Sequence, residues 1–196
     1  MAKQKRLRKE ALKSFANVTH SPQELKGKWK SVIFRNDAPI SLELGCGHGN
    51  YSIALAQKYR DRNFVGIDLK GARLWVGAKY ALEQQLSNIF FIRMNILDLA
   101  DVFDADDIDE IWIPFPDPYP KKPRKRLTAP RFLAVYQQIC KPQARLHLKT
   151  DVDGLYESAI ESISSFGCTL DRQILNLYAE PHLEELLNIQ TSYEKK

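Results

Sequence analysis

The alternation of short apolar runs with segments of helical periodicity constrains the fold of this chain more than any other feature. Five apolar runs of strand length follow one another, with expected bounds 40–44, 64–69, 89–94, 110–115 and 145–149. Between these runs, apolar residues recur three or four positions apart, which is typical of amphipathic helices. Units of strand, helix and strand at this spacing form parallel sheets through right-handed crossovers. The sequence therefore predicts an α/β fold with a doubly wound sheet.

The ends of the expected helices carry signals of their own. Pro130 suits the first turn of a helix, where its missing N–H would have no partner in any case. A later helix is expected over 155–166. Two final apolar runs, 174–178 and 189–193, are interpreted as a last pair of strands. With them, the expected sheet is mostly parallel and has seven strands.

Residues 1–36 are expected to form a basic N-terminal arm and a lead-in helix, ahead of one domain over 37–196. The first 13 residues hold six Lys or Arg and one Glu. Four apolar side chains of the lead-in are available to pack on the body of the domain. They are Trp29, Val32, Ile33 and Phe34.

The positive charge is concentrated in a few segments. The net charge is +5, and the 33 residues between Asp117 and Asp151 hold nine Lys or Arg and no acid. Clusters of this kind are typical of proteins that bind a polyanion such as RNA or DNA, although a solvated charged face produces the same pattern.

Other function classes lack their sequence signals. There is no uninterrupted apolar run of the roughly 18 residues that a membrane helix needs, and no secretory signal at the N-terminus. The three Cys and four His are widely scattered, so we expect reduced thiols and no metal site. These features favour a cytoplasmic protein.

A glycine cluster follows the first expected strand, at the place where open α/β sheets bind their ligands. Gly45, Gly47 and Gly49 form the pattern G-x-G-x-G, and Glu43 lies two residues ahead of it. A dinucleotide fingerprint would need its third glycine at position 50, which is Asn50 here. The spacing therefore argues against a dinucleotide oxidoreductase.

This pattern resembles motif I of the class I methyltransferases, which use S-adenosylmethionine. In our interpretation, the Glu43 carboxylate helps to orient the cationic methionine end of that cofactor. The resemblance also implies that Asp68, after the second strand, binds the ribose hydroxyls. Asn95, after the third strand, would read the adenine edge, since an amide both donates and accepts hydrogen bonds.

The segment after the fourth strand is rich in proline and then in positive charge. Five prolines lie within 113–126 and restrict the backbone strongly. Asp117 lies between two of them, and Tyr119 follows. The sequence therefore predicts an acid and an aromatic side chain held stiffly beside the cofactor loop.

This segment resembles the F-P-D-P-W-x-K signature of the bacterial tRNA (guanine-N7-)-methyltransferases, with Tyr119 in place of the commoner Trp. The Thr150-Asp151 pair resembles another family element. A third resemblance is to the terminal T-x-F-E of the family. It comprises Thr191, Ser192, Tyr193 and Glu194. The resemblance thus covers nearly the whole chain.

The resemblance implies a methyl transfer from S-adenosylmethionine to N7 of a guanine, at nucleotide 46 of the tRNA variable loop, with S-adenosylhomocysteine as product. It implies that Asp117 is the catalytic residue and also lies at the cofactor, and that Lys121, Asp151 and residues 191–194 bind the substrate. Four further cations are expected to contact tRNA phosphates. They are Lys122, Arg124, Lys125 and Arg126. A monomer and a homodimer are both compatible with the sequence.

Two alternatives remain at this stage. One is an amino-methyltransferase acting on adenine or cytosine, whose motif usually places two prolines together, whereas here prolines alternate as P-D-P-Y. The other is a non-catalytic RNA-binding subunit of the same fold, which would have no need for Glu43, Asp68 and Asp117.

Overall fold

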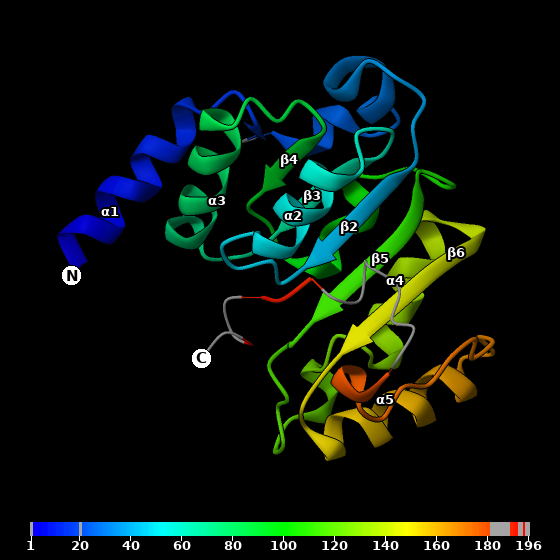
Figure 1. Cartoon of the computed structure of the whole chain (residues 1–196). Coiled ribbons are helices and arrows are strands. Elements are labelled where there is room, and N and C mark those ends of the chain that lie inside the picture. Colours follow the sequence, from blue (N-terminus) through cyan, green and yellow to red (C-terminus); the bar gives the residue numbers. More distant parts are fainter. Residues whose placement is uncertain (1, 20, 181–188, 192–193, 195–196) are drawn as a thin grey trace.

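The computed structural model describes residues 2–19, 21–180, 189–191 and 194. Its centre is a parallel sheet with the strand order β1-β4-β3-β2-β5-β6 (Figure 1). The strands are β1 (Val18–Thr19), β2 (Ile40–Leu44), β3 (Asn63–Ile67), β4 (Ile89–Ile92), β5 (Ile108–Pro114) and β6 (Cys140–Lys149).

Helices cover both faces of this sheet. The α-helices are α1 (Ala2–Ala11), α2 (Asn50–Lys58), α3 (Gly71–Glu83), α4 (Pro130–Ile139) and α5 (Asp153–Ser165). Shorter helical segments are η1 (Leu12–Ser14), η2 (Pro22–Leu25), η3 (Trp29–Phe34), η4 (Ile96–Asp101), η5 (Pro123–Lys125) and η6 (Leu177–Ala179). One core contains side chains of α2 and α3, and the other contains those of η3, η4 and α4. The predicted doubly wound α/β class is confirmed.

The alternation of side chains along β2 assigns its residues to these two cores. Ile40, Leu42 and Leu44 pack in the core that contains α4. Ser41 and Glu43 point to the opposite face, as the two-residue period of a strand requires, and both are buried. The central strand therefore carries a buried carboxyl group on the face that α2 covers.

The strand order places a switch point between β2 and β5. From β2 the chain proceeds outward through β3 to β4, and then returns to the other side of β2 as β5 and β6. At such a point the connections leave neighbouring strands in opposite directions and open a crevice at the carboxyl ends. The loops after β2 and β5 both begin there.

The sheet has six strands in the described part of the chain, so the predicted seven is wrong. Residues 174–178 form no strand, because 174–176 are irregular and 177–178 belong to η6, and Leu175 is 88% exposed. The apolar run alone predicted a strand, yet no neighbouring strand pairs with it. Residues 189–191 are also outside any strand, and 192–193 lie outside the described residues.

The lead-in supplies a strand that the sequence did not predict. Val18 and Thr19 pair with Phe91 and Ile92 at the edge of the sheet. Before it, α1 packs along α3, where the Arg8 guanidinium lies 4.9 Å from the ring centroid of Trp75 (Figure 1). The N-terminal segment is therefore part of the sheet and of one helical layer.

The expected packing of the lead-in is confirmed for its aromatic side chains. Trp29 and Phe34 are buried, and the Trp29 N–H donates to the Val102 carbonyl at 2.9 Å. Val32 is 49% exposed, so the expectation that it packs on the body of the domain is wrong.

Candidate functional site

The glycine loop between β2 and α2 is held in left-handed backbone conformation. Gly45, Gly47 and Gly49 have φ angles of 72°, 59° and 68°. Residues with a Cβ rarely adopt this region, which explains the glycine at every second position. The N–H groups of Gly45 and Cys46 both donate to the Ile67 carbonyl, at 2.9 and 3.0 Å. The loop is thereby fixed to the end of β3.

Asp68 connects the end of β3 to this loop. Its Oδ2 accepts a hydrogen bond from the Gly47 N–H at 2.9 Å, and its Oδ1 accepts one from the Lys70 N–H at 2.7 Å. The side chain thus lies beside the second glycine, although 21 residues separate the two in sequence. The carboxyl ends of β2 and β3 bring two predicted cofactor residues together.

Glu43 lies beneath the loop, at the start of α2. Its Oε2 accepts hydrogen bonds from the Ser52 N–H at 2.8 Å and from the Ser52 hydroxyl at 2.5 Å. Burial raises the pKa of Glu43 to about 7, in spite of these two bonds. A cationic group brought to this carboxyl would favour its ionised form.

Asn95 lies three residues beyond β4, at the same edge of the sheet. Its side-chain oxygen accepts from the Leu97 N–H at 3.3 Å and caps η4. The side chain is exposed. The amide group therefore remains at the surface near the carboxyl end of the sheet.

The proline-rich segment leaves β5 at the switch point and holds two residues in left-handed conformation. Phe115 and Tyr119 have φ angles of 50° and 42°. Non-glycine residues in this region carry strain that the surrounding structure must sustain. Between them Asp117 is exposed, and it accepts a hydrogen bond from the Tyr119 hydroxyl at 3.3 Å. The structure therefore places the acid and the aromatic side by side after β5, at the switch point.

The basic run after this acid divides into two groups. Lys121, Lys122, Arg124 and Lys125 are exposed. Arg126 is partly buried, and its guanidinium donates to the backbone carbonyls of Pro118 at 2.9 Å and Gly154 at 3.0 Å. Four cations of the run are therefore available to a ligand in solution, whereas Arg126 is bound within the protein.

Lys149, at the end of β6, joins three segments that are distant in sequence. Its carbonyl accepts from the Phe115 N–H at 2.8 Å, and its ammonium lies 5.5 Å from the Tyr51 ring centroid and 5.6 Å from that of Phe115. The same ammonium forms a buried ion pair with Glu194 at 2.9 Å. Lys149 thus links the C-terminal Glu194 to the start of the proline-rich segment and to α2.

Both oxygens of Glu194 have partners inside the protein. Oε1 accepts from Lys149 and from the Tyr178 hydroxyl, and Oε2 accepts from the Thr191 N–H at 2.6 Å. Burial acts to raise the pKa of Glu194, but these hydrogen bonds and the Lys149 charge hold it below its usual range. Ser192 and Tyr193, predicted to contact the substrate, lie outside the described residues.

Asp151 lies two residues beyond β6, at the same edge of the sheet as the other predicted site residues. It is exposed, and the turn that carries it is closed by a hydrogen bond from the Val152 N–H to the Thr150 hydroxyl at 3.1 Å. The loops after β5 and β6 therefore place Asp117 and Asp151 at adjacent strand ends.

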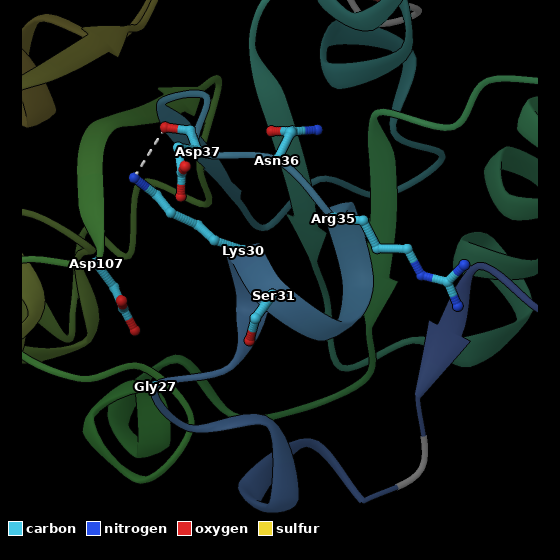
Figure 2. Close-up of a pocket in the computed structure, with 7 residues that line it drawn as sticks. All are labelled: Gly27, Lys30, Ser31, Arg35, Asn36, Asp37 and Asp107. Carbon is cyan, nitrogen blue, oxygen red and sulfur yellow. Dashed lines mark hydrogen bonds between the residues drawn. The ribbon is translucent and has the colours of Figure 1, made fainter.

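A hollow of about 590 Å³ lies at the opposite end of the sheet. Asn36 and Asp37 line it just before β2, and Asp107 lines it just before β5 (Figure 2). In Figure 2 the Lys30 ammonium reaches the Asp37 carbonyl, and the two atoms are 3.1 Å apart. None of the predicted site residues lines this hollow, and Asp68, Asn95, Asp117 and Asp151 follow the carboxyl ends of strands, so the hollow is separate from them.

Comparison with known proteins agrees with this arrangement. Residues 37–196 match a family described as "Putative methyltransferase". The tRNA (guanine-N(7)-)-methyltransferase of Porphyromonas gingivalis is 43% identical over 173 residues, which cover 88% of this chain and 71% of that protein. The chain belongs to the tRNA (guanine-N(7)-)-methyltransferase family. The enzyme of that name from Christiangramia forsetii is 42% identical over 182 residues, covering 91% of this chain and 81% of its own.

Solved structures show that the family member described here shares the methyltransferase fold. The crystal structure of the 16S rRNA methyltransferase KamB superposes with a TM-score of 0.63 at 18% identity, covering 86% of this chain and 84% of that one. A second match, an antibiotic-related methyltransferase, has a TM-score of 0.60 at 20% identity and covers 74% and 76% of the two chains. At these identities the likeness concerns the fold alone.

Sequence reasoning missed three residues that support the site. Ser52 binds Glu43, Lys149 binds Glu194, and Gly77 of α3 lies against the carbonyl of His48 in the glycine loop. Only Gly77 had a signal, since an isolated glycine inside a helix often marks a close approach.

No helix in the described ranges is long and apolar enough to cross a membrane.

Proposed function

We propose that this protein transfers the methyl group of S-adenosylmethionine to N7 of a guanine in the variable loop of tRNA. The observation that carries the proposal is the position of the P-D-P-Y segment, which leaves β5 at the switch point beside the glycine loop. Membership of the tRNA (guanine-N(7)-)-methyltransferase family supports the choice of base and atom. The same relatives speak against an adenine or cytosine amino-methyltransferase.

The residues at the carboxyl edge fit S-adenosylmethionine. In the glycine loop, no atom lies within 4 Å of a Cβ added at Gly47, so a nucleoside can approach the backbone there. Asp68 offers carboxylate oxygens suited to ribose hydroxyls, and the exposed Asn95 offers an amide suited to an adenine edge. The cofactor would supply an electrophilic methyl group on sulfur.

The protein's part in the reaction is mainly positioning. Guanine N7 has an in-plane lone pair, so no residue needs to remove a proton before the methyl group is transferred. Transfer leaves a positive charge on the ring, which the exposed Asp117 carboxylate would stabilise while it holds the base in place. Asp151 would accept hydrogen bonds from the guanine N1–H and amino group. Lys121 would also bind the substrate.

Exposed cations supply the remaining affinity for tRNA. Lys122, Arg124 and Lys125 would bind phosphates, which raises affinity and salt dependence but selects no sequence. In this proposal, residues 37–196 form the methyltransferase domain and the basic arm within 1–36 adds contacts to RNA. The enzyme would act in the cytoplasm, on tRNA.

The test is incubation with labelled S-adenosylmethionine and unmodified tRNA, followed by nucleoside analysis. Label is expected in 7-methylguanosine, and label found only in adenine or cytosine would refute the proposal. If the protein neither binds the cofactor nor labels tRNA, it would instead be a non-catalytic subunit.

Asp117→Ala tests the role of the carboxylate. Because that group is expected to act on the guanine, kcat should fall by about 10²–10³-fold, while the dissociation constant for S-adenosylmethionine stays within a few fold. Calorimetric titration of the cofactor into the variant measures the second quantity. If the variant loses cofactor binding, Asp117 contacts the cofactor and not the guanine, and the proposed role is wrong.

A further inference from the structure

Arg126 connects the two loops that carry the predicted substrate residues. Its Nε donates to the carbonyl of Pro118, which directly follows Asp117. Its Nη1 donates to the carbonyl of Gly154, which lies in the first turn of α5, three residues after Asp151. One guanidinium therefore joins the proline-rich part of the loop after β5 to the first turn of α5, which directly follows the loop that carries Asp151.

The proline-rich part of the loop after β5 needs a side-chain donor. Pro116, Pro118 and Pro120 have no N–H, so this segment cannot form a regular hydrogen-bond pattern with a neighbouring strand. Tyr119, adjacent to Pro118, has a φ of 42°, a conformation that the surroundings must maintain. A bond to the Pro118 carbonyl holds the chain between Asp117 and this strained residue.

Arg126 differs from its neighbours in the basic run in its exposure and its hydrogen bonds. Arg124 and Lys125 are exposed, whereas Arg126 is partly buried and bound to two backbone carbonyls. Arginine suits this task because its planar fork presents several N–H donors in fixed directions, which a lysine ammonium does not.

We propose that Arg126 is a positioning residue that holds Asp117 and Asp151 at a fixed separation for the guanine, and is not a contact for tRNA phosphate. The inference rests on the proposed function. It replaces the sequence-based expectation that groups Arg126 with the phosphate-binding cations of the same run.

Charge-conserving substitutions separate the two roles, with Arg60 as the matched control. Arg126→Lys keeps the charge but loses the fork, so kcat should fall by roughly 10–100-fold while the KM for tRNA stays within about threefold. Arg60→Lys, at an exposed arginine between α2 and β3 and outside both loops, should behave as the wild type. Arg124→Gln should raise the KM for tRNA and lower the slope of its salt dependence by about 1.

Limited proteolysis by trypsin tests the same inference without methyl transfer. Arginine-to-lysine changes preserve the trypsin sites, so any difference in cleavage reports loop structure. In the absence of tRNA, cleavage within 121–126 should be several-fold faster in Arg126→Lys than in Arg124→Lys. If the wild type makes no 7-methylguanosine, the proposed function fails, yet this comparison still decides whether Arg126 holds the loop.

Two results would overturn the inference. One is equal cleavage of the two lysine variants together with an unchanged kcat for Arg126→Lys. The other is an Arg126→Gln variant that matches Arg124→Gln in KM and salt slope, which is the behaviour of a phosphate contact. Cofactor affinity, measured for each variant, should stay at the wild-type value because the glycine loop is untouched.

Discussion

Gly77 lies in the middle of α3, at the point where this helix meets the glycine loop. A Cβ added at this position would lie 2.1 Å from the carbonyl oxygen of His48 and 3.4 Å from the Phe91 ring. The nearer atom belongs to the backbone, so it cannot give way by a side-chain rotation. We therefore expect Gly77→Ala to push α3 and the glycine loop apart.

Two opposing effects set the size of this change. Alanine in a helix interior is favoured over glycine by about 1 kcal/mol. Overpacking of this kind typically costs about 1–3 kcal/mol, and contact with a fixed carbonyl belongs at the upper end. The net result should be a loss of about 1–2 kcal/mol in the free energy of unfolding, with a several-fold weaker affinity for S-adenosylmethionine.

Gly154→Ala is the matched control, because Gly154 is also helical but has no atom within 4 Å of an added Cβ. It should leave cofactor affinity unchanged and raise stability by up to about 1 kcal/mol. Urea denaturation gives both free energies, and calorimetry gives the affinities. A Gly77→Ala variant as stable as Gly154→Ala, with wild-type cofactor affinity, would refute the close approach of helix and loop.

Two further predictions concern buried charges. Because burial raises the pKa of Glu43 to about 7, the native state keeps a proton that the unfolded chain releases near pH 4.5. The stability that this proton contributes is full below about pH 4.5 and is lost as pH rises through 7. Between pH 5 and 8, the free energy of unfolding of the cofactor-free wild type, measured with urea, should therefore fall more than that of Glu43→Gln. Parallel pH profiles of the two proteins would contradict this. Lys149→Met should cost about 3 kcal/mol, since it leaves the buried Glu194 carboxylate without its counter-charge, and adding Glu194→Gln should recover part of that loss. A double-mutant cycle by urea denaturation measures the coupling, and additive losses would show that the pair is not coupled.

Much of the fold could be predicted because local signals and tertiary contacts agree in its centre. β2 has the predicted bounds, since a buried apolar run ends directly in a glycine cluster. α4 begins at Pro130, as its helix-start signal indicated. At the edges the signals fail: β6 begins at Cys140, five residues before the expected 145, and includes Pro142. A proline is tolerated there because β6 is an edge strand.

The site could be predicted where its residues follow strand ends, and not where a contact depends on side-chain direction. The sequence predicted that Asp68 and Asp117 lie at one edge of the sheet, where the carboxyl ends of parallel strands meet, and the structure places both there. A run of cations does not reveal that Arg126 turns inward while Arg124 remains in solvent. The Lys149–Glu194 pair joins residues 45 positions apart, so no local pattern could indicate it.

The edge strand β1 has a consequence for the order in which the molecule assembles. Val18 pairs with Phe91, so β1 must wait during synthesis for a partner 73 positions later, the difference between 91 and 18. Pairings of this separation close large loops and form slowly. The basic helix α1 precedes β1 and packs on α3, so its place also depends on residues that come later in the chain. On a ribosome, α1 therefore lacks this partner until residues 71–83 have emerged.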